Sequence, residues 1–298
     1  MHIAGLNLRN PTMLAAGILG MTGLSLRKVW NAGAGAVVTK SISFQPRLGY
    51  KNPTIVDVGY GFLNAMGIPN PGVYEYVEEA KIAISEGELV IIVSLYGNTP
   101  LEFAKMARIV ETAGVNAVEL NLSCPHVKLG GMEIGTNPTI IDKIVKTVKK
   151  HINIPVFTKL TPNISDIKTI ARAAEDAGSD GIVAINTVKA MAIDVESGRP
   201  LLANKYGGLS GPAIKPIALR CVYEIAQSVN IPVIGCGGIT DWKDAIEFFL
   251  AGASAIQIGT AIAYKDVNIF GEIIKGIKCY LKRKGYNNIK EIVGLSHT

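Results

Sequence analysis

The chain has 298 residues, of which 48% are hydrophobic and 18% are charged, and its formal net charge is +6. This length and balance predict one large α/β domain with a substantial core. No apolar run reaches the ~18 residues of a membrane span, and the longest basic run is Lys282-Arg283-Lys284, so we expect neither a membrane nor a nucleic-acid partner.

Eight short apolar segments recur along the chain and predict buried parallel strands. Several begin about three residues after an Ala-Gly pair such as Ala32-Gly33, where a glycine would close the preceding helix. They are apolar on both faces, as in parallel sheets covered by helices. The predicted strands cover 13–17, 36–41, 89–95, 117–123, 155–160, 181–187, 232–238 and 255–261.

The segments between these strands have the periodicity of amphipathic helices. It is clearest over 140–148, 167–174 and 242–250, where apolar residues recur three and four positions apart. Asp241 is the expected N-cap of the last of these. Eight strands alternating with helices predict a (β/α)₈ TIM barrel that forms a single domain over residues 1–298.

Each predicted strand ends in a polar residue or in a glycine-containing pair. In a TIM barrel these ends converge on the active site, and the long connections 42–72, 125–137 and 188–213 would surround it. Packing alone explains such a consistent set poorly. The strand ends are Ala16-Gly17, Lys40-Ser41, Ser94, Asn121, Lys159, Asn186-Thr187, Gly237-Gly238 and Gly259-Thr260.

The glycines after the seventh and eighth strands, Gly237-Gly238 and Gly259, predict a phosphate site. Glycines let backbone N–H groups approach an anion, and a following helix adds the positive end of its dipole. No dinucleotide-binding fingerprint is present. Two strand-end lysines, Lys40 and Lys159, are costly to bury unless they face an anionic ligand or an acidic side chain, and both alternatives stay open.

Three asparagines, Asn64, Asn121 and Asn186, are expected at the same mouth. Each amide offers donors and an acceptor, so together they suit a flat ligand with amide edges and a carboxylate. Each of them alone is more often a turn or capping residue.

The four cysteines, Cys124, Cys221, Cys236 and Cys279, show no metal-ligand spacing. We expect reduced thiols in a cytoplasmic protein and no metal site. Cys124 follows the fourth strand, where a thiolate could act as a base or nucleophile, although a buried free cysteine is common. The neighbouring His126 leaves a Cys–His hydrolase open. The other three cysteines are expected to be structural.

Nine segments resemble class 1 dihydroorotate dehydrogenases and together cover nearly the whole chain. The SCP and SGPAIKPIALR segments are similar to the 1B subgroup, the NAD-linked catalytic subunits. Cysteine at position 124 argues against class 2, which has serine there. The segments are NPTMLAAGILG, VVTKSIS, GFLNAMGIPNPG, VELNLSCP, FTKLTPN, AINT, GGLSGPAIKPIALR, IPVIGCGGI and AIQIGTA.

The resemblance implies an oxidoreductase that uses FMN to convert dihydroorotate to orotate in de novo pyrimidine (UMP) biosynthesis. The hydride would pass to FMN N5 and the C5 proton to Cys124 as the base. Implied FMN contacts are Ala16, Lys40, Ser41, Ser94, Asn121, Lys159, Ile185, Gly211, Gly237, Gly238, Gly259 and Thr260. Implied substrate contacts are Lys40, Asn64, Ala65, Met66, Gly67, Ile68, Asn121, Asn186 and Thr187.

The same resemblance implies a second subunit with FAD and a [2Fe-2S] cluster that passes electrons to NAD. Two catalytic and two electron-transfer subunits would form a heterotetramer. The chain departs from the family pattern at Ala16, Ser94 and His126, where relatives often have Ser, Asn and Asn. The loop 125–137 contains several glycines and could act as a lid.

Three alternatives remain open from the sequence. One is another FMN barrel of the dihydropyrimidine dehydrogenase type, which would keep the phosphate glycines and Cys124 but change the asparagines. Another is a flavin-free, phosphate-binding barrel isomerase. The third is a non-enzymatic binding protein.

Overall fold

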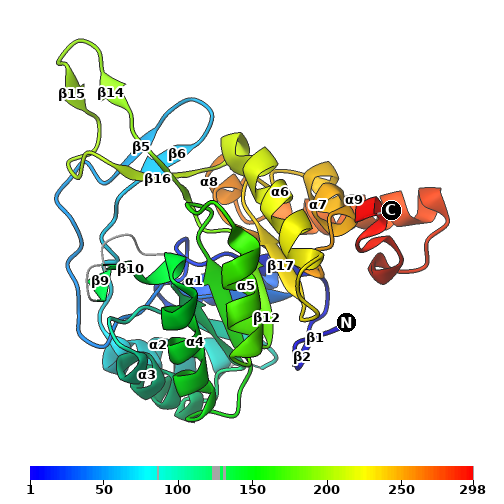
Figure 1. The fold of residues 1–298 in the computed structure, drawn as a ribbon. Coiled ribbons are helices and arrows are strands. Elements are labelled where there is room, and N and C mark those ends of the chain that lie inside the picture. The colour runs from blue at the N-terminus through cyan, green and yellow to red at the C-terminus, as the bar shows by residue number, and fades with distance from the viewer. Residues whose placement is uncertain (86, 123–127, 130–131, 298) are drawn as a thin grey trace.

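Eight parallel strands close into a barrel in the computed structural model, which describes residues 1–85, 87–122, 128–129 and 132–297, with 128–129 and 132–133 described in backbone only (Figure 1). The barrel closes where β18 pairs with β3, with Ile256 opposite Thr12. The predicted (β/α)₈ barrel is confirmed. In order around the barrel the strands are β3 (Thr12–Leu14), β4 (Ala36–Val38), β7 (Ile91–Leu95), β8 (Ala117–Asn121), β11 (Val156–Leu160), β12 (Gly181–Ala184), β17 (Val233–Cys236) and β18 (Ala255–Ile258).

Seven of the eight strands lie within the predicted segments, and β3 begins one residue before its segment, at Thr12; most of the strands end two or three residues earlier than predicted. Ser94, Asn121 and Lys159 stay within the ladder, whereas the residues at the other predicted ends lie beyond their strands. After β17, for example, Gly237 and Gly238 have φ of 132° and 76°, a region that side chains disfavour.

Helices follow the strands and surround the barrel (Figure 1). The predicted N-cap Asp241 is confirmed, because its side chain accepts the N–H groups of Lys243 and Asp244. The helices are α1 (Gly23–Asn31), α2 (Val73–Ile84), α3 (Pro100–Thr112), α4 (Pro138–Lys149), α5 (Ile167–Asp176), α6 (Lys215–Ala226), α7 (Trp242–Leu250), α8 (Ala261–Lys265) and α9 (Ile269–Lys284). No helix in the described part of the chain is long and apolar enough to cross a membrane.

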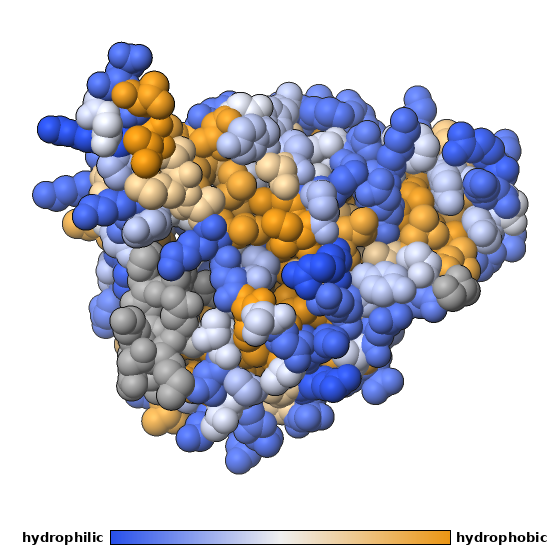
Figure 2. Space-filling model, turned by 45° about the horizontal axis from the view of Figure 1, so that its top comes forward, coloured by the Kyte–Doolittle hydropathy of each residue, from blue (hydrophilic) through white to orange (hydrophobic). Residues whose placement is uncertain are grey.

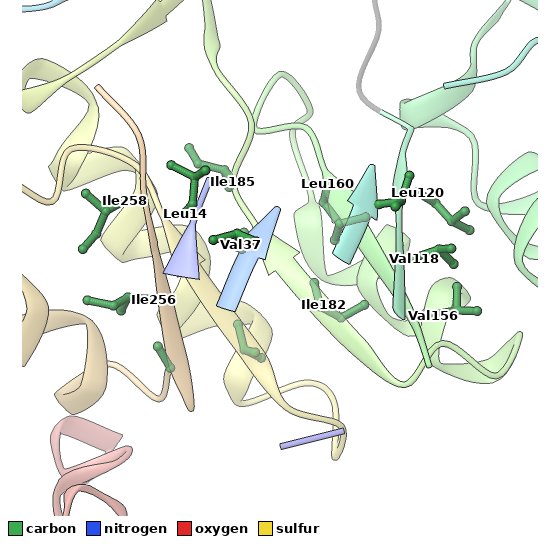
Figure 3. Close-up of a cluster of buried hydrophobic side chains, with 14 of the residues drawn as sticks. Leu14, Val37, Val118, Leu120, Val156, Leu160, Ile182, Ile185, Ile256 and Ile258 are labelled. Carbon is green, nitrogen blue, oxygen red and sulfur yellow. The ribbon is translucent and has the colours of Figure 1, made fainter. Parts of the chain in front are cut away.

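The core has two layers because neighbouring residues of a strand point to opposite faces. Leu14, Val37 and Val118 belong to the larger cluster, which packs the outside of the barrel against the helices (Figure 3). The alternate positions, among them Met13 and Phe157, belong to a second cluster that contains no helix residues and fills the barrel interior. The hairpin of β1 (His2–Ile3) and β2 (Leu6–Asn7) contributes Ile3 and Leu6 to this second cluster.

Two of the long connections build a small antiparallel sheet instead of irregular loops. Its order is β13 (Val188–Ala190), β16 (Gly207–Ser210), β6 (Phe62–Asn64) and β5 (Ile55–Asp57). A hairpin of β14 (Ile193–Asp194) and β15 (Arg199–Pro200) projects beyond it, and Figure 2 shows apolar atoms exposed there. In the third long connection, β9 (Lys128–Leu129) pairs with β10 (Met132–Glu133).

Candidate active site

A cavity of about 760 Å³ lies at the carboxyl ends of the barrel strands. Its lining residues come from the ends of the strands and from the small sheet formed by β5, β6, β13 and β16. Four of the described lining side chains are cationic, and none is acidic: Lys40, Arg47, Lys159 and Lys189. The cavity therefore favours an anionic ligand.

A chain of hydrogen bonds links four predicted site residues across neighbouring strands. The Asn186 amide donates to Asn121 Oδ1 at 3.3 Å, and the Asn121 amide donates to Ser41 Oγ at 2.9 Å. Ser41 Oγ in turn lies 2.9 Å from Ser94 Oγ. Ser94 is fully buried and is absent from the cavity wall. Any effect of Ser94 on a ligand must therefore pass through Ser41.

The predicted phosphate glycines lie together on one wall of the cavity with Gly211 and Thr260. A Cβ at Gly238 would lie 2.7 Å from the Lys215 backbone nitrogen, and one at Gly237 would lie 2.8 Å from the Ala218 Cβ. Side chains are therefore excluded at both positions, which leaves backbone facing the cavity. Thr260 Oγ1 donates to Ser210 Oγ at 2.9 Å and is fixed in place.

The two strand-end lysines have different surroundings. Lys159 lies 3.6 Å from Glu119 and donates to Gln257 Oε1 at 2.9 Å. Of the two open alternatives, an acidic partner is confirmed for Lys159, which also lines the cavity. Lys40 forms no ion pair with any described residue, and burial lowers its pKa below the ordinary value. Lys40 is thus the cation for which an anionic ligand would be the better partner.

The segment from Asn64 to Ile68 forms a second wall. Asn64 donates to the Gly208 carbonyl at 3.0 Å, which ties β6 to β16. Gly67 and Ile68 both have positive φ, at 73° and 55°, so the chain turns sharply here. The Arg47 Nε donates to the Gly67 carbonyl at 3.4 Å and supports this turn.

Comparison with known proteins decides the family. The family model described as dihydroorotate dehydrogenase matches residues 1–281. The chain is 54% identical to the catalytic subunit of dihydroorotate dehydrogenase B (NAD(+)) from Pyrococcus abyssi, over 99% of this chain and 98% of that protein. It is 51% identical to the corresponding subunit from Methanosarcina mazei, over 99% of this chain and 94% of that one.

The chain belongs to the dihydroorotate dehydrogenase family. The same fold occurs in the solved structure of DHODH in complex with ferulenol from Eimeria tenella. It aligns with a TM-score of 0.87 at 22% identity and covers 99% of this chain and 88% of that one.

The structure brings together nearly all the residues that the resemblance to dihydroorotate dehydrogenases predicts. Every predicted substrate contact lines the cavity, and so does every predicted FMN contact except Ser94. The predicted base Cys124 and its neighbour His126 lie outside the described residues. Asn121 earlier in the chain and Gly135 later in the chain both line the cavity.

Sequence reasoning missed several residues of this dihydroorotate dehydrogenase cavity. Cys236, expected to be structural, lines the cavity, because it lies two positions after the inward-facing Ile234. Gln257, which lines the cavity, and the buried Glu119 beneath it were also missed, although polar residues inside otherwise apolar strands were a visible signal. Arg47 and Lys189 come from connections whose path the sequence did not predict.

Proposed function

We propose that this chain oxidises dihydroorotate to orotate with bound FMN, as a catalytic subunit in pyrimidine biosynthesis. The observation that carries the proposal is one cation-lined cavity that gathers the predicted cofactor and substrate residues. Membership of the dihydroorotate dehydrogenase family supports the choice of substrate.

The glycine wall fits the phosphate of FMN. Gly237 and Gly238 admit no side chain, so their backbone can approach an anion closely. The remaining contacts would hold the flavin ring against the floor of the cavity and the ends of the barrel strands. The proposed FMN contacts are Ala16, Lys40, Ser41, Asn121, Lys159, Ile185, Gly211, Gly237, Gly238, Gly259 and Thr260, with Ser94 acting through Ser41.

The second wall and the asparagines of the strand ends suit dihydroorotate. Asn64, Asn121 and Asn186 carry the donors and acceptors that a ring with amide edges needs, and Thr187 lies next to them. The turn from Ala65 to Ile68 exposes backbone to the cavity. Lys40, which has no ion-pair partner among the described residues, would face the substrate carboxylate.

The reaction removes a proton from C5 and a hydride from C6, and a C5–C6 double bond forms. FMN supplies the hydride acceptor when it is bound. We assign the proton to Cys124, which follows Asn121 by three residues, a stretch that reaches at most about 11 Å. The Lys159 ammonium would stabilise negative charge on the reduced cofactor from the cavity floor.

The partner proposal rests on the relatives' names, which describe catalytic subunits of an NAD(+)-dependent enzyme. We propose that a second subunit with FAD and a [2Fe-2S] cluster accepts the electrons and passes them to NAD. Two copies of each subunit would form a heterotetramer. A cytoplasmic location stays a prediction from the sequence.

Turnover of dihydroorotate and dihydrouracil with an artificial electron acceptor tests this function. We expect turnover of dihydroorotate only, because dihydrouracil lacks the carboxylate that Lys40 would face. Preference for dihydrouracil would favour the dihydropyrimidine dehydrogenase type. A protein that takes up no FMN would favour the phosphate-binding isomerase. One that binds FMN and orotate without turnover would be a binding protein.

The base is tested by Cys124→Ser with Cys279→Ser as the matched control, since Cys279 is exposed on α9. Serine is a far weaker base than a thiolate, so reduction of bound flavin should slow by about 10²–10⁴-fold at neutral pH. The control should keep the wild-type rate. Equal rates in both variants would remove Cys124 from the role of base.

A further inference from the structure

A buried polar triad crosses the barrel just below the cavity. Gln257 on β18 accepts a hydrogen bond from Lys159 Nζ at 2.9 Å and donates one to Glu119 Oε2 at 2.7 Å. Lys159 Nζ lies 3.6 Å from Glu119 Oε1. In the closed barrel β18 lies opposite β8, which carries Glu119. The triad therefore joins opposite walls through the barrel interior.

The charges of this triad depend on each other. The side chains of Lys159 and Glu119 are 5% and 0% exposed, and a lone buried lysine would release its proton. Burial lowers the pKa of Lys159, but the Glu119 carboxylate acts against it, and the net pKa is raised. Lys159 is therefore an ammonium group at neutral pH, and Glu119 is the main reason.

The three residues of the triad lie at two depths. Lys159 and Gln257 line the cavity, whereas Glu119 lies beneath them and has no exposed surface. Glu119 Oε1 has no hydrogen-bond partner among the described residues. Leaving a carboxylate oxygen with only an ion pair is costly, so this pair is poorly explained as a stabilising contact alone.

We propose that Glu119 and Gln257 are positioning residues for Lys159, which hold its ammonium group charged and fixed at the cavity floor toward the bound cofactor. The inference rests on the proposed function for the identity of that cofactor. A fixed cation at this place favours the anionic, reduced form of a flavin without reorganisation during the reaction. Glu119 never touches the ligand and acts only through Lys159.

Other charged groups surround the triad. Cys236 on β17 faces Lys159, and burial chiefly raises the pKa of its thiol, so it is neutral near pH 7. Lys40, Arg47 and Lys189 line the same cavity from other elements. Among the described residues of the cavity and its floor, Glu119 is the acidic group acting on Lys159.

The first test needs no cofactor. Competitive labelling of the flavin-free protein with an amine reagent, followed by peptide mass spectrometry, gives the pH at which each lysine becomes reactive. We expect wild-type Lys159 to titrate no lower than the exposed Lys143. In Glu119→Gln, labelling of Lys159 at pH 8 should rise at least about tenfold, since a pKa drop of one unit has this effect.

The control is Asp142→Asn, which removes the partner of Lys146 on the surface of α4 and should leave Lys159 unchanged. The proposal is overturned if wild-type Lys159 titrates well below Lys143, a result that needs no variant to fold. An unchanged titration of Lys159 in folded Glu119→Gln overturns it as well.

The second test uses the FMN-loaded protein and sulfite, which adds to a flavin more tightly when a cation lies near. We compare the sulfite dissociation constant of Glu119→Gln with that of the wild type. The ratio of the two constants should rise about tenfold between pH 7 and pH 9, because Lys159 loses its proton in the variant. A ratio that stays constant over this range contradicts the proposal. Failure to bind FMN would instead count against the proposed function, while the labelling result stands.

Discussion

The barrel interior has two levels that differ in chemistry although the same strands build both. Residues two positions apart in a strand point to the same side, and four of the strands, β8, β11, β17 and β18, contribute one side chain to each level. The lower level holds Ala117, Phe157, Ile234 and Ala255, all apolar and buried. The upper level holds Glu119, Lys159, Cys236 and Gln257.

The difference shows how the fold separates stability from chemistry. The lower level packs against the N-terminal hairpin and has no access to the cavity, whereas the upper level forms the cavity floor. In TIM barrels function lies at the C-terminal face, while the opposite end serves stability. Substitutions two residues apart in one strand should therefore have opposite consequences.

The largest expected effect is on stability, at Phe157 in the lower level. Phe157→Ala leaves a cavity in a fully packed layer and should lower the free energy of unfolding by about 3–5 kcal/mol. Urea unfolding measures this loss, and FMN titration of the folded fraction should give wild-type affinity. Weakened FMN binding without loss of stability would contradict the assignment of stability to the lower level and of chemistry to the upper level.

The upper level should behave in the opposite way. Replacing the buried ion pair with apolar residues, Glu119→Leu with Lys159→Met, should leave stability unchanged or raise it by about 1–4 kcal/mol. Reduction of bound flavin by dihydroorotate should slow by about 10²–10³-fold, because a positioned charge is lost. Stopped-flow absorbance and urea unfolding of the same preparation give both values. A strongly destabilised variant with an unchanged rate would reverse the assignment.

Lys40 should show a smaller effect on binding and a defined pH dependence. Burial lowers its pKa below the ordinary lysine value, so the free protein loses this proton before the unfolded chain does. Orotate is an anion and needs the charged form of Lys40. The affinity for orotate should therefore be highest below the lowered pKa of Lys40 and should fall as the pH rises through that pKa.

Lys40→Met should cost about 1.5–3 kcal/mol of orotate affinity and remove this pH dependence. Equilibrium titration of the FMN-loaded protein from pH 7 to pH 10 measures both. Identical pH profiles for the variant and the wild type would exclude Lys40 as the carboxylate partner.

The smallest effect is expected at Ser94, which touches the cavity only through Ser41. Ser94→Ala should weaken FMN binding by about 0.5–1.5 kcal/mol, the value of one buried hydrogen bond. Fluorescence titration with FMN is sensitive enough to detect this. A loss of FMN affinity as large as the loss of orotate affinity expected for Lys40→Met would show that Ser94 contacts the cofactor directly.

Much of the barrel could be predicted from sequence because its strands lie in apolar runs of five to seven residues that alternate with amphipathic helices and are bounded by local turn signals. The cavity residues at strand ends could be predicted for the same reason, since the fold fixes where strand ends meet. The small sheet was predicted as loops, because strands of three or four residues such as β5 and β16 carry no usable periodicity.

The triad could not be predicted, because its partners are far apart in sequence. Gln257 and Glu119 are 138 residues apart, and nothing local to either position indicates the other. A polar residue within one apolar strand shows that something faces it. Only the closed barrel shows that its partner is on the opposite wall.

We propose that the upper level of the barrel faces a flavin that dihydroorotate reduces. The most direct test of this proposal is the visible spectrum of the FMN-loaded protein, recorded without oxygen before and after one equivalent of dihydroorotate. We expect the visible flavin band to bleach, with release of one orotate per flavin. A band that persists with excess dihydroorotate, in a protein that binds FMN, would contradict it.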